Sequence, residues 1–233
     1  MIQKFHSRDA WADAAADRLA GALADALAAD GRALFAGSGG STPSPIYTRL
    51  AQSDLDWTKV TATLVDERYV PEASPDSNAA LLKHSLLIGP AAAARFIPLY
   101  SPAVTVDRAA ALASQALTAE GRALDAVLLG MGEDGHICSM FPSSPTLTTL
   151  LTPSLKPAVY GVPAGRDGAA PPQERLSLNL PWLAGARCVV LALTGAKKRA
   201  VFEREAAGDP AVSPIAALIA AKAPLEVIWT EAG

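Results

Sequence analysis

The candidate for acid–base chemistry is His136, which ends the segment GMGEDGH at residues 130–136. An imidazole ordinarily titrates at a pH of about 6.5, which suits a general base near neutral pH. Asp134 stands two residues earlier and could hold the ring in one tautomer. The alternative is a structural histidine in a tight turn. Aspartate and histidine also bind metals, but His6 and His84 are far away in the sequence, so we expect neither a metal nor another cofactor.

A loop of small residues, GSGGSTP at residues 37–43, could bind an anion. Gly39 and Gly40 would let the backbone approach a ligand closely, and Ser41 and Thr42 add hydroxyl donors. Because a helix is predicted to follow, N–H groups at its start could face a phosphate. The loop is neither a Walker A loop, which needs a following Gly-Lys-Ser/Thr, nor GxGxxG, which needs a third glycine. The alternative is a tight turn that caps the helix.

Charged residues that follow two other predicted strands could complete an anion site. Asp66, Glu67 and Arg68 come directly after an apolar strand. A guanidinium can hold a phosphate through two hydrogen bonds, and a neighbouring carboxylate could orient it or bind sugar hydroxyls. Lys197 and Lys198 begin a predicted helix, which is a common place for anion contacts. The alternative is a solvated loop in the first case and a solvated helical face in the second, and composition alone favours the solvated loop.

Two further side chains are weaker candidates. Arg175 precedes a predicted strand and could reach the same site. Cys138 lies close to His136, but no second element of a Cys-His catalytic pair can be named, so we expect a buried thiol without a role in the reaction.

Strands that alternate with helices must position these residues. The predicted strands lie at residues 1–5, 33–36, 60–65, 96–99, 124–129, 158–163, 174–180, 188–193 and 225–230. The predicted helices lie at 9–29, 43–50, 78–87, 105–120, 196–206 and 214–221, with a turn or short helix at 143–151 and a Gly- and Pro-rich loop at 164–173. This alternation predicts an α/β fold: a three-layer, doubly wound, mainly parallel sheet with helices on both faces. Ligands of such sheets bind beyond the carboxyl ends of the strands, where the three suspect loops could converge.

The composition limits the classes of protein that fit. The chain has 233 residues, half of them hydrophobic, which fits one domain spanning residues 1–233. A net charge of −3 with interspersed signs argues against nucleic-acid or membrane binding. Cys138 and Cys188 form no CxxC pattern, which argues against a disulfide framework. The first residues, MIQKFHSRDAW, are not a targeting sequence, and the apolar stretches are too short to span a bilayer. We expect a cytoplasmic protein, a monomer or a weak homodimer.

Taken together, these segments resemble the 6-phosphogluconolactonases, within a wider group that includes the glucosamine-6-phosphate deaminases. One such motif would be weak, but six in the right order over nearly the whole chain are specific. The matching segments are GSGGSTP at 37–43, DERYVP at 66–71 with Ser77-Asn78, GMGEDGH at 130–136 with Phe141-Pro142, ERLSLNLP at 174–181, TGAKK at 194–198, and Trp229.

The resemblance implies a three-layer doubly wound fold and a small-molecule partner, a sugar-phosphate lactone. The implied reaction is hydrolysis of 6-phospho-D-glucono-1,5-lactone to 6-phosphogluconate in the oxidative pentose phosphate pathway. By resemblance, His136 is the general base, and we choose Asp134 to orient it. The residues implied to bind phosphate or other substrate oxygens are Gly39, Gly40, Ser41, Thr42, Asp66, Arg68 and Lys198.

Two positions depart from the lactonase pattern. Ile137-Cys138 stands where these enzymes usually carry Thr-Ala, and isoleucine is what the deaminases tend to carry there. The usual Trp-Asp ending is here Trp229-Thr230-Glu231.

Two other functions are kept as alternatives. A deaminase would carry a glutamate five residues after the histidine, where this chain has Phe141, and paired aspartates where it has Val65-Asp66. Both differences favour lactone hydrolysis over amino-sugar isomerisation. A non-catalytic sugar-phosphate sensor would normally carry a helix-turn-helix extension, and no segment here is free to provide one.

Overall fold

A seven-stranded sheet, with all neighbouring strands parallel, forms the centre of the computed structural model, which describes residues 2–40, 42–103, 105–142, 144–165 and 172–232. In spatial order its strands are β1 (Ile2–Phe5), β10 (Leu225–Thr230), β9 (Val189–Thr194), β6 (Ala126–Leu129), β2 (Ala33–Gly37), β3 (Val60–Leu64) and β5 (Arg95–Phe96). The chain leaves β2 toward β3, whereas β6 lies on the other side of β2 and leads toward β9. The direction of winding therefore reverses between β2 and β6, which is where such sheets bind their ligands.

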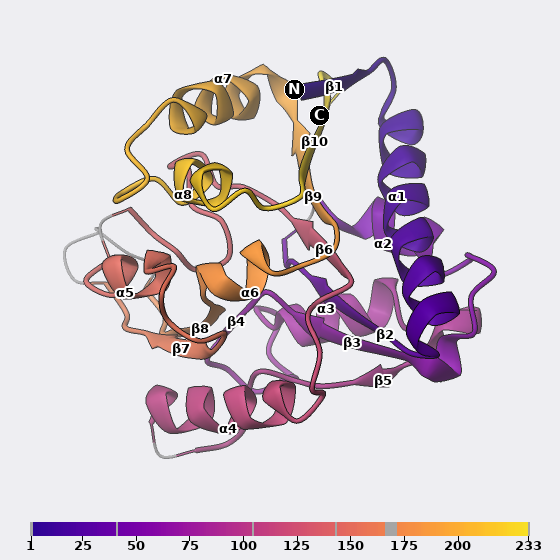
Figure 1. Ribbon diagram of the computed structural model, residues 1–233, viewed down its shortest axis with the longest axis horizontal. Coiled ribbons are helices and arrows are strands. Elements are labelled where there is room, and N and C mark those ends of the chain that lie inside the picture. Colours follow the sequence, from indigo (N-terminus) through magenta and orange to yellow (C-terminus); the bar gives the residue numbers. More distant parts are fainter. Residues whose placement is uncertain (1, 41, 104, 143, 166–171, 233) are drawn as a thin grey trace.

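Helices cover both faces of this sheet. They are α1 (Arg8–Asp30), α2 (Ser44–Leu50), α3 (Asn78–Ser85), α4 (Val106–Thr118), α5 (Leu147–Leu151), α6 (Leu180–Ala184), α7 (Gly195–Ala206) and α8 (Pro214–Ala220), with short 3-10 turns at Trp57–Lys59 and Gly89–Ala93. Figure 1 shows α1 and α2 on one face and α6, α7 and α8 on the other. The prediction of a three-layer, doubly wound α/β fold is confirmed.

The longest helix, α1, shows how local sequence sets an element. The Ser7 hydroxyl accepts a hydrogen bond from the backbone N–H of Ala10 at 3.1 Å and so caps the first turn. Gly31 ends the helix with a φ of 70°, a left-handed conformation that glycine adopts without steric cost. Trp11, Leu19 and Leu23 lie on one face and are completely buried against the sheet.

A second, three-stranded antiparallel sheet is the main feature that the sequence did not predict. It consists of β4 (Asp66–Arg68), β8 (Arg175–Leu178) and β7 (Val159–Val162), with β8 in the middle. Residues 66–68 therefore form a strand rather than a solvated loop, because β8 pairs with them and their two carboxylates are buried. Helix α6 was also not predicted. The strand expected at residues 174–180 ends at Leu178, and Pro181 in the first turn favours the start of a helix.

The remaining differences from the prediction concern one short strand and one loop. The strand expected at 96–99 is only Arg95–Phe96, and most of the loop at 164–173 lies outside the described residues.

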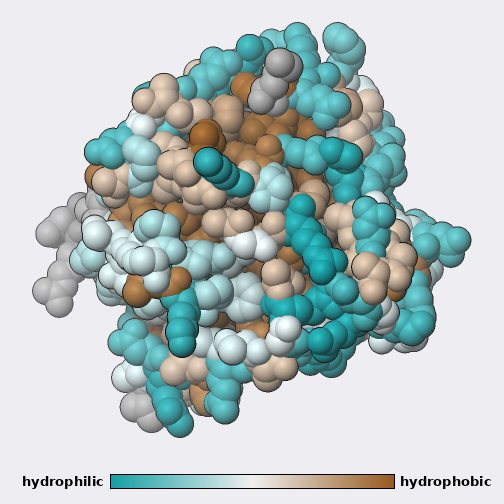
Figure 2. Space-filling model, viewed as in Figure 1, coloured by the Kyte–Doolittle hydropathy of each residue, from teal (hydrophilic) through white to brown (hydrophobic). Residues whose placement is uncertain are grey.

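Figure 2 shows hydrophilic residues along the flank formed by α1, whereas apolar residues gather over α8. No helix within the described ranges is long and apolar enough to cross a membrane.

Candidate active site

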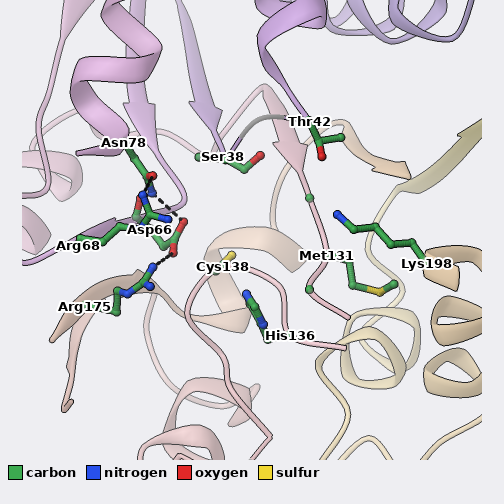
Figure 3. A pocket seen from close by; sticks show the side chains of 14 residues that line it. Ser38, Thr42, Asp66, Arg68, Asn78, Met131, His136, Cys138, Arg175 and Lys198 are labelled. Carbon is green, nitrogen blue, oxygen red and sulfur yellow. Dashed lines mark hydrogen bonds and ion pairs between the residues drawn. The ribbon is translucent and has the colours of Figure 1, made fainter. Parts of the chain in front are cut away.

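A cavity of about 250 Å³ opens at the carboxyl ends of β2, β3, β6 and β9 (Figure 3). Of the residues proposed from the sequence, Gly39, Gly40, Thr42, Asp66, Arg68, His136 and Lys198 line it, whereas Ser41 lies outside the described residues. The other lining residues are Ser38, Asn78, Gly130, Met131, Gly132, Cys138 and Arg175. The three loops singled out in the sequence thus meet in one place, as parallel strands with a common carboxyl edge require.

The cavity has two sides with different chemistry. On one side are residues that stand on the connections following β2, β6 and β9. We call this the loop side, and its members are Ser38, Gly39, Gly40, Thr42, Gly130, Met131, Gly132 and Lys198. We call Asp66, Arg68, Asn78 and Arg175 the guanidinium side. In Figure 3, Thr42 and Lys198 lie across the cavity from Arg68 and Arg175, with His136 between the two groups.

On the loop side, glycine is required at positions 39 and 40 for two different physical reasons. Gly40 has a φ of 86° and open space around a would-be Cβ, so its requirement is conformational. A Cβ on Gly39 would stand 1.8 Å from the Asn78 side-chain oxygen, so its requirement is close packing between the two sides. The Ser38 hydroxyl is buried, lines the cavity and has no hydrogen-bond partner within the described residues.

His136 is held by contacts on several sides. Its Nδ1 lies 2.5 Å from Oδ1 of Asp134, so the proposed contact between the two is present. The ring packs on Phe141 with centroids 4.4 Å apart, and a Cβ on Gly132 would come within 2.3 Å of the imidazole. If Nδ1 carries the proton and donates it in a hydrogen bond to Asp134, Nε2 is left as the acceptor, the state that a general base needs.

The Asp134 carboxyl responds to the same contact. Burial acts to raise its pKa, but the hydrogen bond and electrostatic attraction of the His136 ring, helped by backbone N–H groups, hold the pKa below its ordinary value. Asp134 is therefore an ionised acceptor at neutral pH and can fix the imidazole tautomer.

A network of hydrogen bonds crosslinks the guanidinium side. Arg68 Nη1 donates to the backbone oxygen of Asp76 at 2.6 Å and to Oδ1 of Asn78 at 2.9 Å. The Asn78 amide donates to the backbone oxygen of Asp66 at 2.9 Å. The hydroxyl of Ser139 donates to Oδ2 of Asp66 at 2.7 Å. Asp66 and Arg68 are thus fixed in place before any ligand arrives.

Glu67 faces away from the cavity and anchors this side to α3. Its carboxylate accepts the backbone N–H groups of Arg68, Asn78 and Ala79 at 2.7 to 2.8 Å and the Ser77 hydroxyl at 3.2 Å. Burial raises its pKa, and the three backbone donors oppose that shift. The sequence proposal that Glu67 binds sugar or orients the Arg68 guanidinium does not fit this position, because the side chain is fully buried beneath the strand.

The two adjacent lysines, Lys197 and Lys198, lie in different environments. Lys197 is largely exposed and pairs with Glu133 at 2.5 Å, away from the cavity lining. Lys198 lines the cavity, and burial lowers the pKa of its ammonium while Glu133 offsets part of that effect. Helical spacing could have indicated which of the two lysines faces inward. Lys198 precedes the buried residues Val201 and Phe202 by three and four positions, so it lies on the same face of the helix.

Three lining residues had little or no place in the sequence argument. Asn78 was noted only as part of a motif, Arg175 was a weaker candidate, and Met131 was not proposed. Cys138 is buried as expected, although it also lines the cavity with a φ of 51°. Burial, together with the charge of Asp66, raises the pKa of its thiol well above its ordinary value, so it is a poor nucleophile. Within the described ranges, no group of three His, Cys, Asp or Glu residues is arranged to hold a metal ion.

Comparison with known proteins places this chain in a family of sugar-phosphate enzymes. Residues 6–229 match the family model of glucosamine-6-phosphate isomerases and 6-phosphogluconolactonases, and the chain belongs to this family.

Three similar proteins of that family carry the lactonase name. The chain is 43% identical over 227 residues to a 6-phosphogluconolactonase of Rhizobium meliloti, covering 97% of this chain and 96% of that protein. It is 40% identical over 230 residues to one from Caulobacter vibrioides, covering 99% and 97%. The crystal structure of a 6-phosphogluconolactonase from Shewanella baltica superimposes with a TM-score of 0.89 at 32% identity, covering 99% of this chain and 97% of that one.

Proposed function

We propose that this chain hydrolyses 6-phospho-D-glucono-1,5-lactone to 6-phosphogluconate, the reaction of the oxidative pentose phosphate pathway. The observation that carries the proposal is the Asp134–His136 pair at the cavity, flanked by cationic side chains on both sides. The names of relatives that align over nearly the whole chain support it.

The two sides of the cavity suggest how the substrate lies. The loop side offers Gly39, Gly40 and Thr42 together with the Lys198 ammonium, a set that suits a phosphate. Figure 3 shows Arg68 across the cavity from Lys198, which favours separate groups of the substrate for the two cations. We therefore assign the phosphate to the loop side and give Arg68 and Asp66 other oxygens of the substrate.

His136 would act on a water molecule beside the lactone carbonyl. Nε2 takes a proton as the water oxygen bonds to C1, and the carbonyl electron pair moves onto its oxygen. The tetrahedral intermediate then collapses, the bond between C1 and the ring oxygen breaks, and the imidazolium returns the proton to the departing oxygen. The anchored phosphate holds C1 near the base, which converts a loose encounter into an oriented pair.

The neighbourhood of His136 favours this reaction over amino-sugar isomerisation. The position where deaminases carry their ring-opening glutamate is Phe141, which packs against the imidazole with centroids 4.4 Å apart. Asp134 is the only carboxylate that contacts the His136 ring among the described residues.

The test is a pH-stat assay with freshly generated lactone, comparing wild type with His136→Asn. We expect wild type to exceed the spontaneous rate, and loss of the general base to reduce kcat by about 10²–10⁴-fold. The matched control is His84→Asn, an exposed histidine on α3. Wild-type protein that does not exceed the spontaneous rate contradicts lactonase activity. Turnover of glucosamine 6-phosphate would then identify a deaminase, and binding without turnover a sensor.

A further inference from the structure

Arg175 is a partly buried cation without a close partner among the residues that the structure describes. Its side chain is 15% exposed, and its Nε has no hydrogen-bond partner within the described residues. Among the described residues, the carboxylate nearest to it is Asp66 at 3.9 Å, which already accepts a hydrogen bond from Ser139. Burial lowers the pKa of the guanidinium, and the positive charge of Arg68 on the paired strand acts in the same direction, against the attraction of Asp66.

Another partly buried arginine, Arg122, shows what a structural guanidinium looks like in this protein. Its Nε also lacks a hydrogen-bond partner within the described residues, so the contrast with Arg175 lies in the terminal nitrogens. The Arg122 side chain is 9% exposed and donates to the backbone oxygen of Arg32 at 2.7 Å and to Oδ1 of Asp125 at 2.9 Å. Buried charges normally have such partners, because desolvation without them is costly. Arg175 bears that cost at the cavity, which indicates that an anionic ligand supplies the missing oxygens.

Phe141 links Arg175 to the proposed base. The guanidinium carbon of Arg175 lies 5.8 Å from the centroid of this ring, and the His136 ring lies 4.4 Å from the same centroid. Both polar groups therefore contact the same aromatic ring, and Figure 3 shows both at the cavity, with Arg175 across from Thr42 and Lys198. A substrate with its phosphate on the loop side would turn its opposite end, the carbonyl end, toward Arg175.

We propose that Arg175 is a catalytic residue that binds the C1 oxygen of the lactone, first as the oxyanion and then as the carboxylate of the product. This proposal rests on the lactonase function proposed above. As hydroxide bonds to C1, the carbonyl electron pair becomes a localised negative charge on oxygen, and the guanidinium N–H groups donate to it. After the ring C–O bond breaks and the acid ionises, the same donors face a planar carboxylate, the anion that guanidinium binds best.

The decisive variant is Arg175→Met, which keeps an unbranched side chain over Phe141 and removes the charge. Loss of an oxyanion donor should lower kcat by about 10²–10³-fold. The melting temperature should stay the same or rise, because the charge removed is partly buried and its contact with Asp66 is long, at 3.9 Å. Arg175→Lys should retain more activity than Arg175→Met, and Arg204→Gln, an exposed arginine on α7, is the control for net charge.

Binding of two inhibitors separates this role from phosphate binding. 6-Phosphogluconate carries both a phosphate and a carboxylate, whereas glucitol 6-phosphate has the same chain and phosphate without the carboxylate. Arg175→Met should weaken 6-phosphogluconate binding about tenfold or more and leave glucitol 6-phosphate binding unchanged. Equal weakening of both, unchanged kcat, or a large fall in melting temperature overturns the proposal.

The activity assay, together with calorimetric titration of the two inhibitors, distinguishes failure of this proposal from failure of the proposed function. If wild type lacks lactonase activity, the proposed function fails and Arg175 is not a catalytic residue. Discrimination between the two inhibitors would then still show whether Arg175 binds a carboxylate. If wild type is active and Arg175→Met is equally active, the lactonase function stands and only the role of Arg175 is refuted.

Discussion

The two sides of the cavity differ in what holds their polar groups. On the guanidinium side, Asp66, Arg68 and Asn78 are bonded to one another and anchored from behind by Glu67. On the loop side, the Ser38 hydroxyl has no partner within the described residues, and Lys198 makes no ion pair there. One side is crosslinked before a ligand binds, and the other presents donors for the ligand to satisfy. We expect mutations of the bonded residues Asp66, Arg68 and Asn78, and of their anchor Glu67, to change stability. Mutations on the loop side, and of Arg175, which lies outside that network, should change activity without a loss of stability.

The largest effect should come from Glu67→Ala, which removes the anchor of the guanidinium side. Four donors lose their acceptor: the backbone N–H groups of Arg68, Asn78 and Ala79 and the Ser77 hydroxyl. An unsatisfied buried donor costs about 1–3 kcal/mol, so we expect a loss of about 3 kcal/mol or more in unfolding free energy. Urea denaturation measures it, with the exposed Glu72→Ala as control. A loss below about 1 kcal/mol would show that the two sides do not differ in this way.

Gly39→Ala tests the contact between the two sides. A methyl group there would overlap the Asn78 side chain, which must move and release Arg68. Because a displacement of about 1 Å near a reacting group can cost about 10²-fold in rate, we expect a fall in kcat/KM of that order.

The matched control for this variant is Gly21→Ala, which meets no atom within 4 Å in the middle of α1. It should leave kcat/KM unchanged and raise stability by about 0.5–1 kcal/mol. Full activity in Gly39→Ala would mean that Asn78 does not hold Arg68 in its working position.

The sequence predicted the loop side better than the guanidinium side, and the reason is physical. Strand, small-residue loop and helix follow one another along the chain around Gly39, so local patterns were enough. The guanidinium side depends on pairing between β4 and β8, whose residues Arg68 and Arg175 are far apart in the chain. Three charges in a row are typical of a loop, and only tertiary burial makes Asp66–Arg68 a strand. For the same reason, the sequence could not rank Arg175 above the weaker candidates for the site.

Lys198→Met tests whether the loop side binds substrate through its lysine. Loss of a charge-assisted hydrogen bond to phosphate should lower kcat/KM about 10- to 100-fold with little change in melting temperature. The neighbouring Lys197→Met is the matched control. It loses only an exposed ion pair with Glu133, so its kcat/KM should stay within about fivefold of wild type. A larger effect at Lys197 than at Lys198 in initial-rate measurements would contradict the assignment.

The smallest effect should come from Asp134→Asn, which keeps a side-chain oxygen near His136 and removes the charge. The Asp134 side chain is 52% exposed, so the expected loss in kcat is about fivefold at most. Because folding lowers the pKa of Asp134, its contribution to stability is present above the ordinary carboxyl pKa of 3.8 and is lost as the pH falls below that value.

The stability gap between wild type and Asp134→Asn should therefore be below about 1 kcal/mol at neutral pH and close at acid pH. Denaturation at several pH values measures the gap, and Glu133→Gln, whose carboxylate pairs with Lys197 instead of the imidazole, is the control. A gap that widens as the pH falls would mean that Asp134 is not held ionised by His136. The proposed orientation of the base would then need another acceptor for Nδ1.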